Sequence, residues 1–576
     1  MGTLTLEPPS FYVPLKQPSR QIRLIKLSDP GEAANTTDLC CSLIKTNFDD
    51  LARPAYEVLS YCWGDPSQTV PISVNGIVHH ITTNLAAALR TIRDLKRTDL
   101  PIWADALCIN QQDLAEKTCQ VNMMASIFSG AHRCLIWLGE TYDPLKNPTP
   151  HLNSIEEVEA LRAFGLIQSL AQDEHYSEWR SGKGHGDLAP LIALPWWNRI
   201  WTVQETALPR ECVVLCGRLE IPWTTLVAAV RNFQKHHNEM CCARTVSSLK
   251  GFRAKVEHIE HAQEGANVGT IFQRFRDRGA TDDRDKVFGL LAFSALGMGA
   301  DYAATLESVF TRTTRKVIAQ TGTLKVLLRS REYDRNTALP SWVPDLAAKC
   351  DRHRSRELNK WEVWELHNTC AGKKAEMKDG QSEDAPTLTL AGMRIDRIVK
   401  IGAACLDLDP LSPQPEGQVS IPLPNKQWWK LTQTHNDSRL DPFSEVEMRA
   451  AFMRVLTRDC LEDVAPPSYR PTWRRISPAD VEACLSEVRA GRGQRRTFYV
   501  SKMINYRFFV TERGLIGVGP AETRVDDAVF ILYGGRAPFV LRPDGLSWRF
   551  LGDGYVDGIM DGQALDDDKK EWITII

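Results

Sequence analysis

Apolar runs alternate with amphipathic segments over the first 220 residues of the chain. At 84–97, and again from Asp113 onward, apolar residues recur at helical spacing with polar residues on the opposite face. A hairpin turning at Asn75-Gly76 precedes the first of these helices. The alternation of strand and helix predicts an α/β core, with a mostly parallel sheet covered by helices on both faces. The predicted buried strands are 56–63, 102–109, 134–139 and 212–217.

The rest of the chain shows other patterns. Residues 22–27 and 41–44 look like paired strands, an insertion rich in acidic residues and Pro interrupts the core at 140–190, and the last strands are short and separated by glycines. The five predicted regions are an N-terminal strand-containing arm (1–55), the α/β core (56–220), a helical region packed on the core (221–350), a variable helical and loop insert (351–497) and a small all-β C-terminal unit (498–576).

Composition adds few constraints on function. The 576 residues carry a net charge of −2 with 25% charged side chains, which indicates no nucleic-acid partner. The basic stretch 489–496 has no interleaved aromatic residues and is explained by a solvated turn. The N-terminus does not resemble a signal peptide, and no apolar run is long enough to span a bilayer, so we expect a cytoplasmic protein without a membrane span. The 15 cysteines favour reduced core thiols over disulfides.

One predicted strand, 102–109, contains a carboxylate. Asp105 lies in the middle of that run, and a buried carboxylate is costly unless it is paired or hydrogen-bonded. We therefore interpret Asp105 as a structural clamp for an arginine or for backbone amides, in preference to a catalytic group. Asp113 and Glu116, which follow the strand, fit the capping of the next helix.

Six blocks of the sequence resemble the fungal heterokaryon-incompatibility (HET) domain proteins and occur in the order typical of that family. The closing segment, 507–562, resembles the C-terminal β segment of one large branch of these proteins. The resemblance implies a flavodoxin-like core similar to Toll/interleukin receptor (TIR) domains, and a role in nonself recognition that ends in programmed cell death. The six blocks are YEVLSYCWGD (56–65), IWADALCINQQDLAEKTCQVNMMASIF (102–128), CLIWLGE (134–140), PWWNRIWTVQE (195–205), TDDRDKVFGLL (281–291) and LPSWVPD (339–345).

Open α/β sheets bind ligands beyond the carboxyl ends of their strands, and the candidate site lies there. The resemblance assigns to Glu205 the part of a glutamate in the NAD-cleaving site of enzymatic TIR domains. A carboxylate there would stabilise the oxocarbenium-like charge that forms when the nicotinamide–ribose bond breaks. We expect no metal and no resident cofactor, with NAD as the candidate substrate. The predicted substrate-binding residues are Trp63, Asp65, Asn110, Gln111, Arg199 and Trp201. Trp63 or Trp201 would stack on a ring, and Arg199 would hold a phosphate.

Several alternatives stay open. Glu205 and Arg199 could form an ion pair that anchors a Trp-rich helix. The stretch 281–286 is interpreted as a docking element in which Arg284 or Asp285 pairs with the α/β core. The function classes are a TIR-like NAD hydrolase, a non-enzymatic signalling scaffold, and an accessory protein or enzyme of a fungal secondary-metabolite cluster. For the first two classes we expect a protein partner or self-association through the HET domain.

Overall fold

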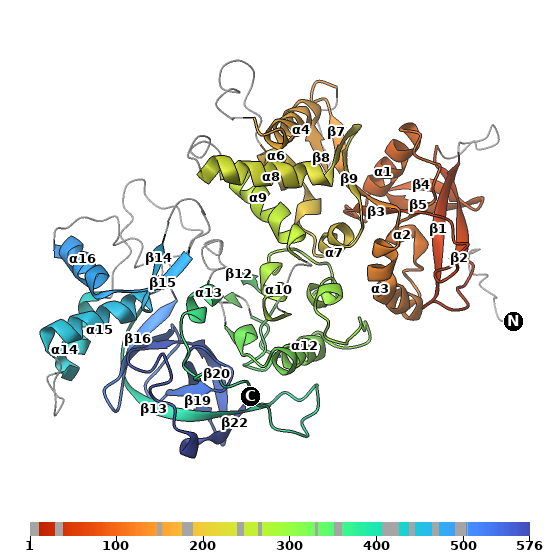
Figure 1. Ribbon diagram of the computed structural model, residues 1–576. Helices are drawn as coiled ribbons and strands as arrows, with labels where there is room; N and C mark the ends of the chain where they lie inside the picture. Colours follow the sequence, from red (N-terminus) through yellow and green to blue (C-terminus); the bar gives the residue numbers. More distant parts are fainter. Residues whose placement is uncertain are drawn as a thin grey trace. The chain divides into compact units, whose positions relative to one another are not determined.

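The computed structural model describes most of the chain, and the chain divides into two compact units (Figure 1). Unit 1 comprises Met1–Ala266 and Arg274–Ala304, and unit 2 comprises Asn267–Gln273 and Thr305–Ile576. Residues 490–496 of the basic stretch lie outside the described residues. The described residues are 11–28, 38–146, 153–174, 188–238, 247–262, 268–328, 332–333, 335–350, 360–405, 425–436, 444–463, 472–489, 503 and 505–576.

Unit 1 is built on a mixed sheet whose central strands are parallel. These are β6 (Ile102–Trp103), β3 (Glu57–Tyr61), β7 (Arg133–Tyr142) and β9 (Cys212–Cys216), in that spatial order. Numbered along the chain, the order is 2-1-3-4, as in flavodoxin-like sheets. The α/β class predicted from the sequence is therefore confirmed. The further strands of the sheet are β1 (Gln21–Ser28), β2 (Cys40–Asn47), β4 (Thr69–Val74), β5 (Ile77–Thr82), β8 (Ser154–Glu156) and β10 (Leu219–Pro222).

Helices cover both faces of this sheet (Figure 1). Helix α1 (Thr83–Asp94) contacts β7 and the hairpin of β4 and β5, α7 (Thr202–Ala207) contacts β3, β7 and α3 (Leu114–Ser129), and α4 (Glu157–Ala171) packs against α8 (Trp223–Asn238) beside β10. Helix α4 arises from the segment 140–190, which the composition had indicated to be an insertion, and its buried apolar side shows that it belongs to the core. The remaining elements of unit 1 are α2 (Asp105–Cys108), α6 (Ala189–Ala193), η1 (Pro195–Asn198), α9 (Ser247–Glu260), α11 (Asp285–Phe288) and η2 (Leu291–Phe293).

The prediction of one strand over 102–109 was wrong. The strand contains only Ile102–Trp103, and the one-turn helix α2 begins at Asp105. The Asp105 Oδ1 atom accepts a hydrogen bond from the Ala106 N–H at 2.8 Å, which suits a carboxylate at the start of a helix. A short apolar run does not by itself distinguish a strand from a buried helical turn.

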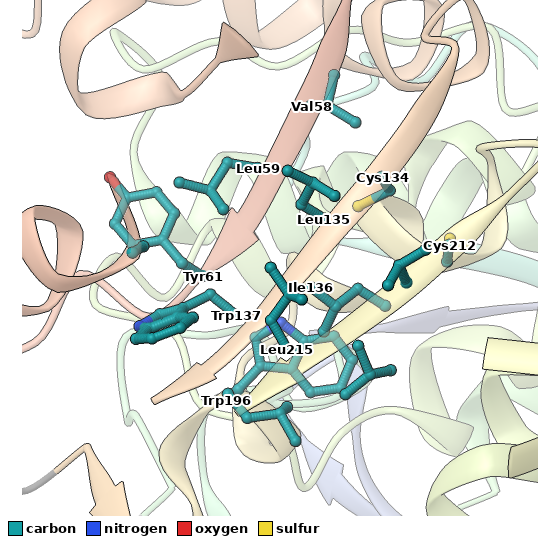
Figure 2. Packing of buried hydrophobic residues seen from close by; sticks show 14 of the residues in the cluster. Val58, Leu59, Tyr61, Cys134, Leu135, Ile136, Trp137, Trp196, Cys212 and Leu215 are labelled. Atoms are coloured by element: carbon teal, nitrogen blue, oxygen red, sulfur yellow. The ribbon is translucent and has the colours of Figure 1, made fainter. Parts of the chain in front are cut away.

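The core of unit 1 lies between the central strands and the helices. Figure 2 shows Leu59 of β3, Ile136 of β7 and Leu215 of β9 on three adjacent strands, and Trp196 lies on the side of the sheet that Ser60 and Ile136 face. All five residues of β9 are buried, as expected for a strand covered on both faces. Cys134 and Cys212 are register partners on β7 and β9, and both are buried thiols.

Unit 2 contains a closed β-barrel. The strands β18, β19, β20, β22 and β13 pair in that order, and β13 pairs again with β18 to close the ring. The 18-residue strand β13 lies within 351–497, which the sequence had assigned to a variable insert, so the β unit includes residues outside 498–576. The barrel and its extension are β13 (Leu388–Cys405), β16 (Tyr506–Thr511), β17 (Ile516–Pro520), β18 (Ala528–Leu532), β19 (Phe539–Asp544), β20 (Ser547–Asp553), β21 (Tyr555–Val556) and β22 (Glu571–Ile575).

Helices and short strands surround the barrel in unit 2. None of the described helices, in either unit, is long and apolar enough to cross a membrane. The elements of unit 2 outside the barrel are η3 (Lys325–Leu327), α12 (Leu306–Thr321), α13 (Lys360–Glu365), α14 (Asn425–Asn436), α15 (Glu445–Thr457), α16 (Pro478–Arg489), η5 (Asp567–Lys569), β11 (Glu332–Tyr333), β12 (Lys349–Cys350), β14 (Cys460–Asp463) and β15 (Thr472–Arg475). Helix α10 (Val268–Arg274) lies where the chain returns to unit 1.

Candidate active site

Glu205 lies on α7 with its carboxyl group turned towards β3. Only 6% of Glu205 is exposed. Its Oε2 atom accepts a hydrogen bond of 2.5 Å from the Ser60 hydroxyl. The Ser60 oxygen in turn accepts a hydrogen bond of 2.9 Å from Nε1 of Trp196. A directed series of donors, from Trp196 to Ser60 to Glu205, therefore holds the carboxyl group in the core.

The surroundings of Glu205 change its protonation. Burial raises the pKa of its carboxyl group to about 7, against the opposing effects of the positive charge of Arg199 and the hydrogen bond from Ser60. The negative charge of Asp105 raises this pKa further. A carboxyl group with a pKa near 7 exchanges its proton readily at neutral pH, which is the property that acid–base sites share.

Arg199 is not in a direct ion pair with Glu205. Among the described residues, its guanidinium donates a hydrogen bond of 2.6 Å to the carbonyl oxygen of Tyr61, at the end of β3. Its charge acts on Glu205 through space. The segment that carries Arg199 and Glu205 is thus attached to the carboxyl end of a central strand.

Asp105 contacts a tryptophan and the backbone. Its Oδ2 atom accepts a hydrogen bond of 2.8 Å from Nε1 of Trp63, and its carbonyl oxygen accepts one of 3.0 Å from the Gln111 side chain. Burial, followed by the charge of Asp105, raises the pKa of Tyr61 well above its usual range. Asp105 therefore links the loop after β3 to the loop after α2, and its charge lies close enough to act on both Tyr61 and Glu205.

Two of the predicted substrate-binding residues are engaged within their own loops. Asp65 is exposed, and its carboxylate accepts hydrogen bonds from the backbone and hydroxyl of Ser67 at 2.9 and 2.7 Å. The Asn110 side chain accepts from the N–H of Gln112 at 3.3 Å. The structure thus connects Glu205, Arg199, Asp105 and Trp63 by hydrogen bonds or charge, and it places Asp65 and Asn110 in local turns.

The stretch 281–286 makes hydrogen bonds within its own segment. Arg284 pairs with Asp282 at 2.6 Å and donates to the carbonyl oxygens of Tyr302 and Ala304. Asp285 accepts a hydrogen bond of 2.8 Å from the Tyr302 hydroxyl; burial raises the pKa of its carboxyl group, and the nearby Trp201 side chain opposes that shift. Both side chains are thus bonded to residues 302–304, and the docking role of the stretch stays a prediction.

The start of α3 differs in part from the expected capping. Asp113 is the N-cap, and its Oδ1 atom accepts from the N–H groups of Ala115 and Glu116, both at 3.0 Å. Glu116 does not return a hydrogen bond to the Asp113 backbone. It is 4% exposed and accepts two hydrogen bonds from Arg23 of β1, at 2.6 and 2.9 Å. The sequence pattern alone did not indicate this partner, which lies 93 residues away.

Two other combinations of reactive side chains, among the residues that the structure describes, do not form a site. Within the described part of the chain, no group of three or more His, Cys, Asp or Glu residues is arranged to hold a metal ion. In unit 2, the thiol of Cys460 lies 3.6 Å from Nε2 of His367, but Arg475 donates to Nδ1 of that ring at 3.1 Å. Nδ1 is then the acceptor and Nε2 carries the proton, so His367 does not act as a base for this thiol.

Two protein-family models match separate parts of the chain. The heterokaryon incompatibility protein (HET) family matches residues 56–205, which run from β3 into α7, and the Het-6 beta-barrel domain family matches residues 480–576. The chain is 25% identical to Heterokaryon incompatibility protein 6, OR allele, of Neurospora crassa, over 97% of this chain and 96% of that protein. No solved structure matches the chain, and the similarity of its core to TIR domains stays a prediction. The chain therefore contains a region that matches the HET family and a later region that matches the Het-6 beta-barrel domain family, and its similarity to a heterokaryon incompatibility protein extends over nearly its whole length.

Proposed function

We propose that the chain acts in nonself recognition between fungal strains, and that its activation ends in death of the mixed cell. One observation carries this proposal: the similarity to a heterokaryon incompatibility protein extends over 97% of the chain, with the HET domain first and the β-barrel last. Similarity limited to the HET core would support the fold but would say little about the role, because one fold can serve many functions.

The test is inducible expression in a fungal host, with growth and membrane integrity measured before and after induction. We expect loss of viability in at least one of several hosts that differ in their incompatibility genes, and normal growth in the others. Equal growth in every host would contradict the proposal, and would favour the alternative of a role in a biosynthetic cluster.

A second proposal concerns the chemistry of the HET domain. The raised pKa of the buried Glu205 supports a site that cleaves the nicotinamide–ribose bond of NAD, as in a TIR-like enzyme. The ionised carboxylate would stabilise the cationic ribose, and its effect would be strong because water is excluded. Nicotinamide leaves as a neutral base, so no strong general acid is needed. Because Glu205 is 6% exposed, we infer that a partner or self-association must open the site before substrate enters.

This chemistry is tested by incubating the purified full chain with NAD and quantifying free nicotinamide. The Glu205→Gln variant keeps an oxygen that accepts from Ser60 but loses the titrating group, so we expect its turnover to fall at least about 100-fold. Glu211→Gln, at an exposed position close by, is the matched control and should retain activity. Intact NAD under conditions that promote self-association, combined with host killing, would leave the non-enzymatic scaffold as the explanation.

A further inference from the structure

A segment outside the matched residues 56–205 is bonded to the turn that carries Arg199. The N–H of Gly279 donates to the carbonyl oxygen of Asn198, and the N–H of Ile200 donates to the carbonyl oxygen of Gly279 at 3.0 Å. These bonds form a short parallel bridge between Gly279 and Arg199. The turn 198–202 is therefore completed by residues that follow it by about 80 positions, although both parts belong to unit 1.

Arg278 is the side chain at the centre of this junction. It is 7% exposed, and its guanidinium donates to the Thr202 hydroxyl oxygen at 2.7 Å and to the carbonyl oxygen of Arg199 at 3.2 Å. The Thr202 hydroxyl itself donates to the same carbonyl oxygen at 2.8 Å. Burial lowers the pKa of Arg278 to about 9, and both acceptors of its hydrogen bonds are neutral oxygens.

Two donors on one carbonyl oxygen fix the orientation of the peptide group that follows Arg199. The direction in which the Arg199 side chain leaves the backbone depends on that orientation, and along this direction its guanidinium reaches the Tyr61 carbonyl oxygen at 2.6 Å. A buried cation whose acceptors are neutral oxygens is costly for stability, because it loses its hydration without gaining an ion pair in return. Its presence here is better explained by the geometry that it imposes on Arg199.

We propose that Arg278 is a positioning residue, which acts through Thr202 and the backbone of Arg199 to hold the Arg199 guanidinium at the distance where it acts on Glu205. The proposal rests on the proposed function of Glu205. It extends the functional site beyond residue 205, to a segment that the HET family match does not include. Arg278 is not among the groups whose charge acts directly on Glu205, so its effect is indirect.

The experiment measures the pKa of the Glu205 carboxyl group in the full chain, by infrared difference spectra against Glu205→Gln. Thr202→Val removes the acceptor of Arg278 without changing any charge, and we expect it to raise the pKa of Glu205 by about one unit as Arg199 moves away. Arg278→Gln should have the same effect, and the double variant should add little to either. Thr202→Ser, which keeps the hydroxyl, should restore the original pKa, and Asp283→Asn, at an exposed position of the same segment, should not change it.

An unchanged pKa of Glu205 in a folded Thr202→Val protein would overturn the proposal, and so would a shift that Thr202→Ser does not reverse. This measurement does not depend on turnover of NAD. If the wild type leaves NAD intact while the pKa shifts as expected, the proposed chemistry fails and the positioning role stands. If NAD is cleaved and the pKa is unchanged in both variants, the positioning role fails alone.

Discussion

The Ser60 hydroxyl donates a hydrogen bond of 2.5 Å to the buried carboxyl group of Glu205, and this contact joins the central strand β3 to helix α7. Because Trp196 already donates to the Ser60 oxygen, the proton of Ser60 points at Oε2 of Glu205. When the carboxyl group takes up a proton, that proton must therefore be on Oε1. The side of Glu205 that exchanges protons is thus set by two neighbours that do not titrate.

The first prediction is a pH dependence of stability that originates at Glu205. The folded pKa, about 7, lies above the usual value of 4.5, so the native state holds this proton more tightly than the unfolded chain. The contribution is fully present below pH 4.5 and is lost as the pH rises through 7. Its size is on the order of 3 kcal/mol. We expect Glu205→Gln to remove this dependence, measured as urea unfolding midpoints of both proteins between pH 4.5 and 8.

The difference between the two proteins is the informative quantity, because other groups titrate in the same range. Glu211→Gln, at an exposed position, should follow the wild type at every pH. Parallel curves for the wild type and Glu205→Gln would show that Glu205 is ionised throughout this range, in disagreement with its burial.

The second prediction separates the two charges that act on Glu205. Arg199 lowers the pKa of the carboxyl group and Asp105 raises it, so their neutral variants should shift that pKa in opposite directions. Arg199→Met should raise it by roughly one unit, and Asp105→Asn should lower it by less. Carboxyl-selective ¹³C NMR of labelled Glu residues would follow both. A shift of the same sign in the two variants would indicate a general change of structure and not the loss of a charge.

Much of unit 1 could be predicted because local patterns decide it. The hairpin at Asn75-Gly76 follows from residues that accept positive φ, here 53° and 80°, and the apolar stripe of α1 follows from its spacing. The prediction of a strand over 102–109 was wrong for a physical reason. Asp105 begins a helical turn through its own carboxylate, and apolar spacing over eight residues contains no information about that hydrogen bond.

The site was predictable only in part, since its contacts join residues far apart in the chain. Glu205 and Arg199 were proposed from one motif, but Arg278 carries no signal of its own and Ser60 carries only a weak one. Ser60 is one hydroxyl in an apolar strand, 145 residues from the carboxyl group that it contacts. Its polar character within a buried run was the one feature that could have singled it out. The long strand β13 was missed because Pro-rich connectors nearby suggested an insert.

The third prediction concerns the buried ion pair between Arg23 and Glu116. Arg23 is 2% exposed and makes two hydrogen bonds to the carboxylate, one of 3.0 Å to the carbonyl oxygen of Cys108, and two, of 3.0 and 3.3 Å, to that of Val13. Removal of one partner leaves a buried charge, so Glu116→Ala should destabilise unit 1 by about 3–5 kcal/mol. The apolar double variant Arg23→Met/Glu116→Leu should recover most of that loss.

The measurement is urea unfolding of the full chain, with hydrogen exchange of peptides from α3 used to assign the transition to unit 1. Asp113→Ala removes only the cap of the same helix and should cost about 1 kcal/mol. Equal losses for Glu116→Ala and Asp113→Ala would mean that water reaches the pair and screens it.

The last prediction applies to unit 2 and has the opposite sign to the first. His367 is fully buried; Arg475 donates to its Nδ1 atom at 3.1 Å, and its Nε2 atom lies 3.2 Å from the carbonyl oxygen of Arg458. Burial, followed by the charge of Arg475, lowers the pKa of His367 from 6.5 to about 4. The unfolded chain therefore binds the proton more tightly, and stability is lost as the pH falls from 6.5 towards 4, by up to ~3 kcal/mol.

His367→Gln tests this dependence without removing the two contacts. The Gln oxygen accepts from Arg475 and its amide donates to the Arg458 carbonyl oxygen, but the side chain does not titrate. We expect the exchange of amide hydrogens in β14 and β15 to accelerate between pH 6.5 and 5 in the wild type, after correction for the intrinsic rate, and much less in the variant. The same acceleration in both proteins would assign the acid sensitivity to another group. A variant that is less stable than the wild type at pH 7 but equal to it at pH 5 would still support His367, since only the wild type loses stability over that interval.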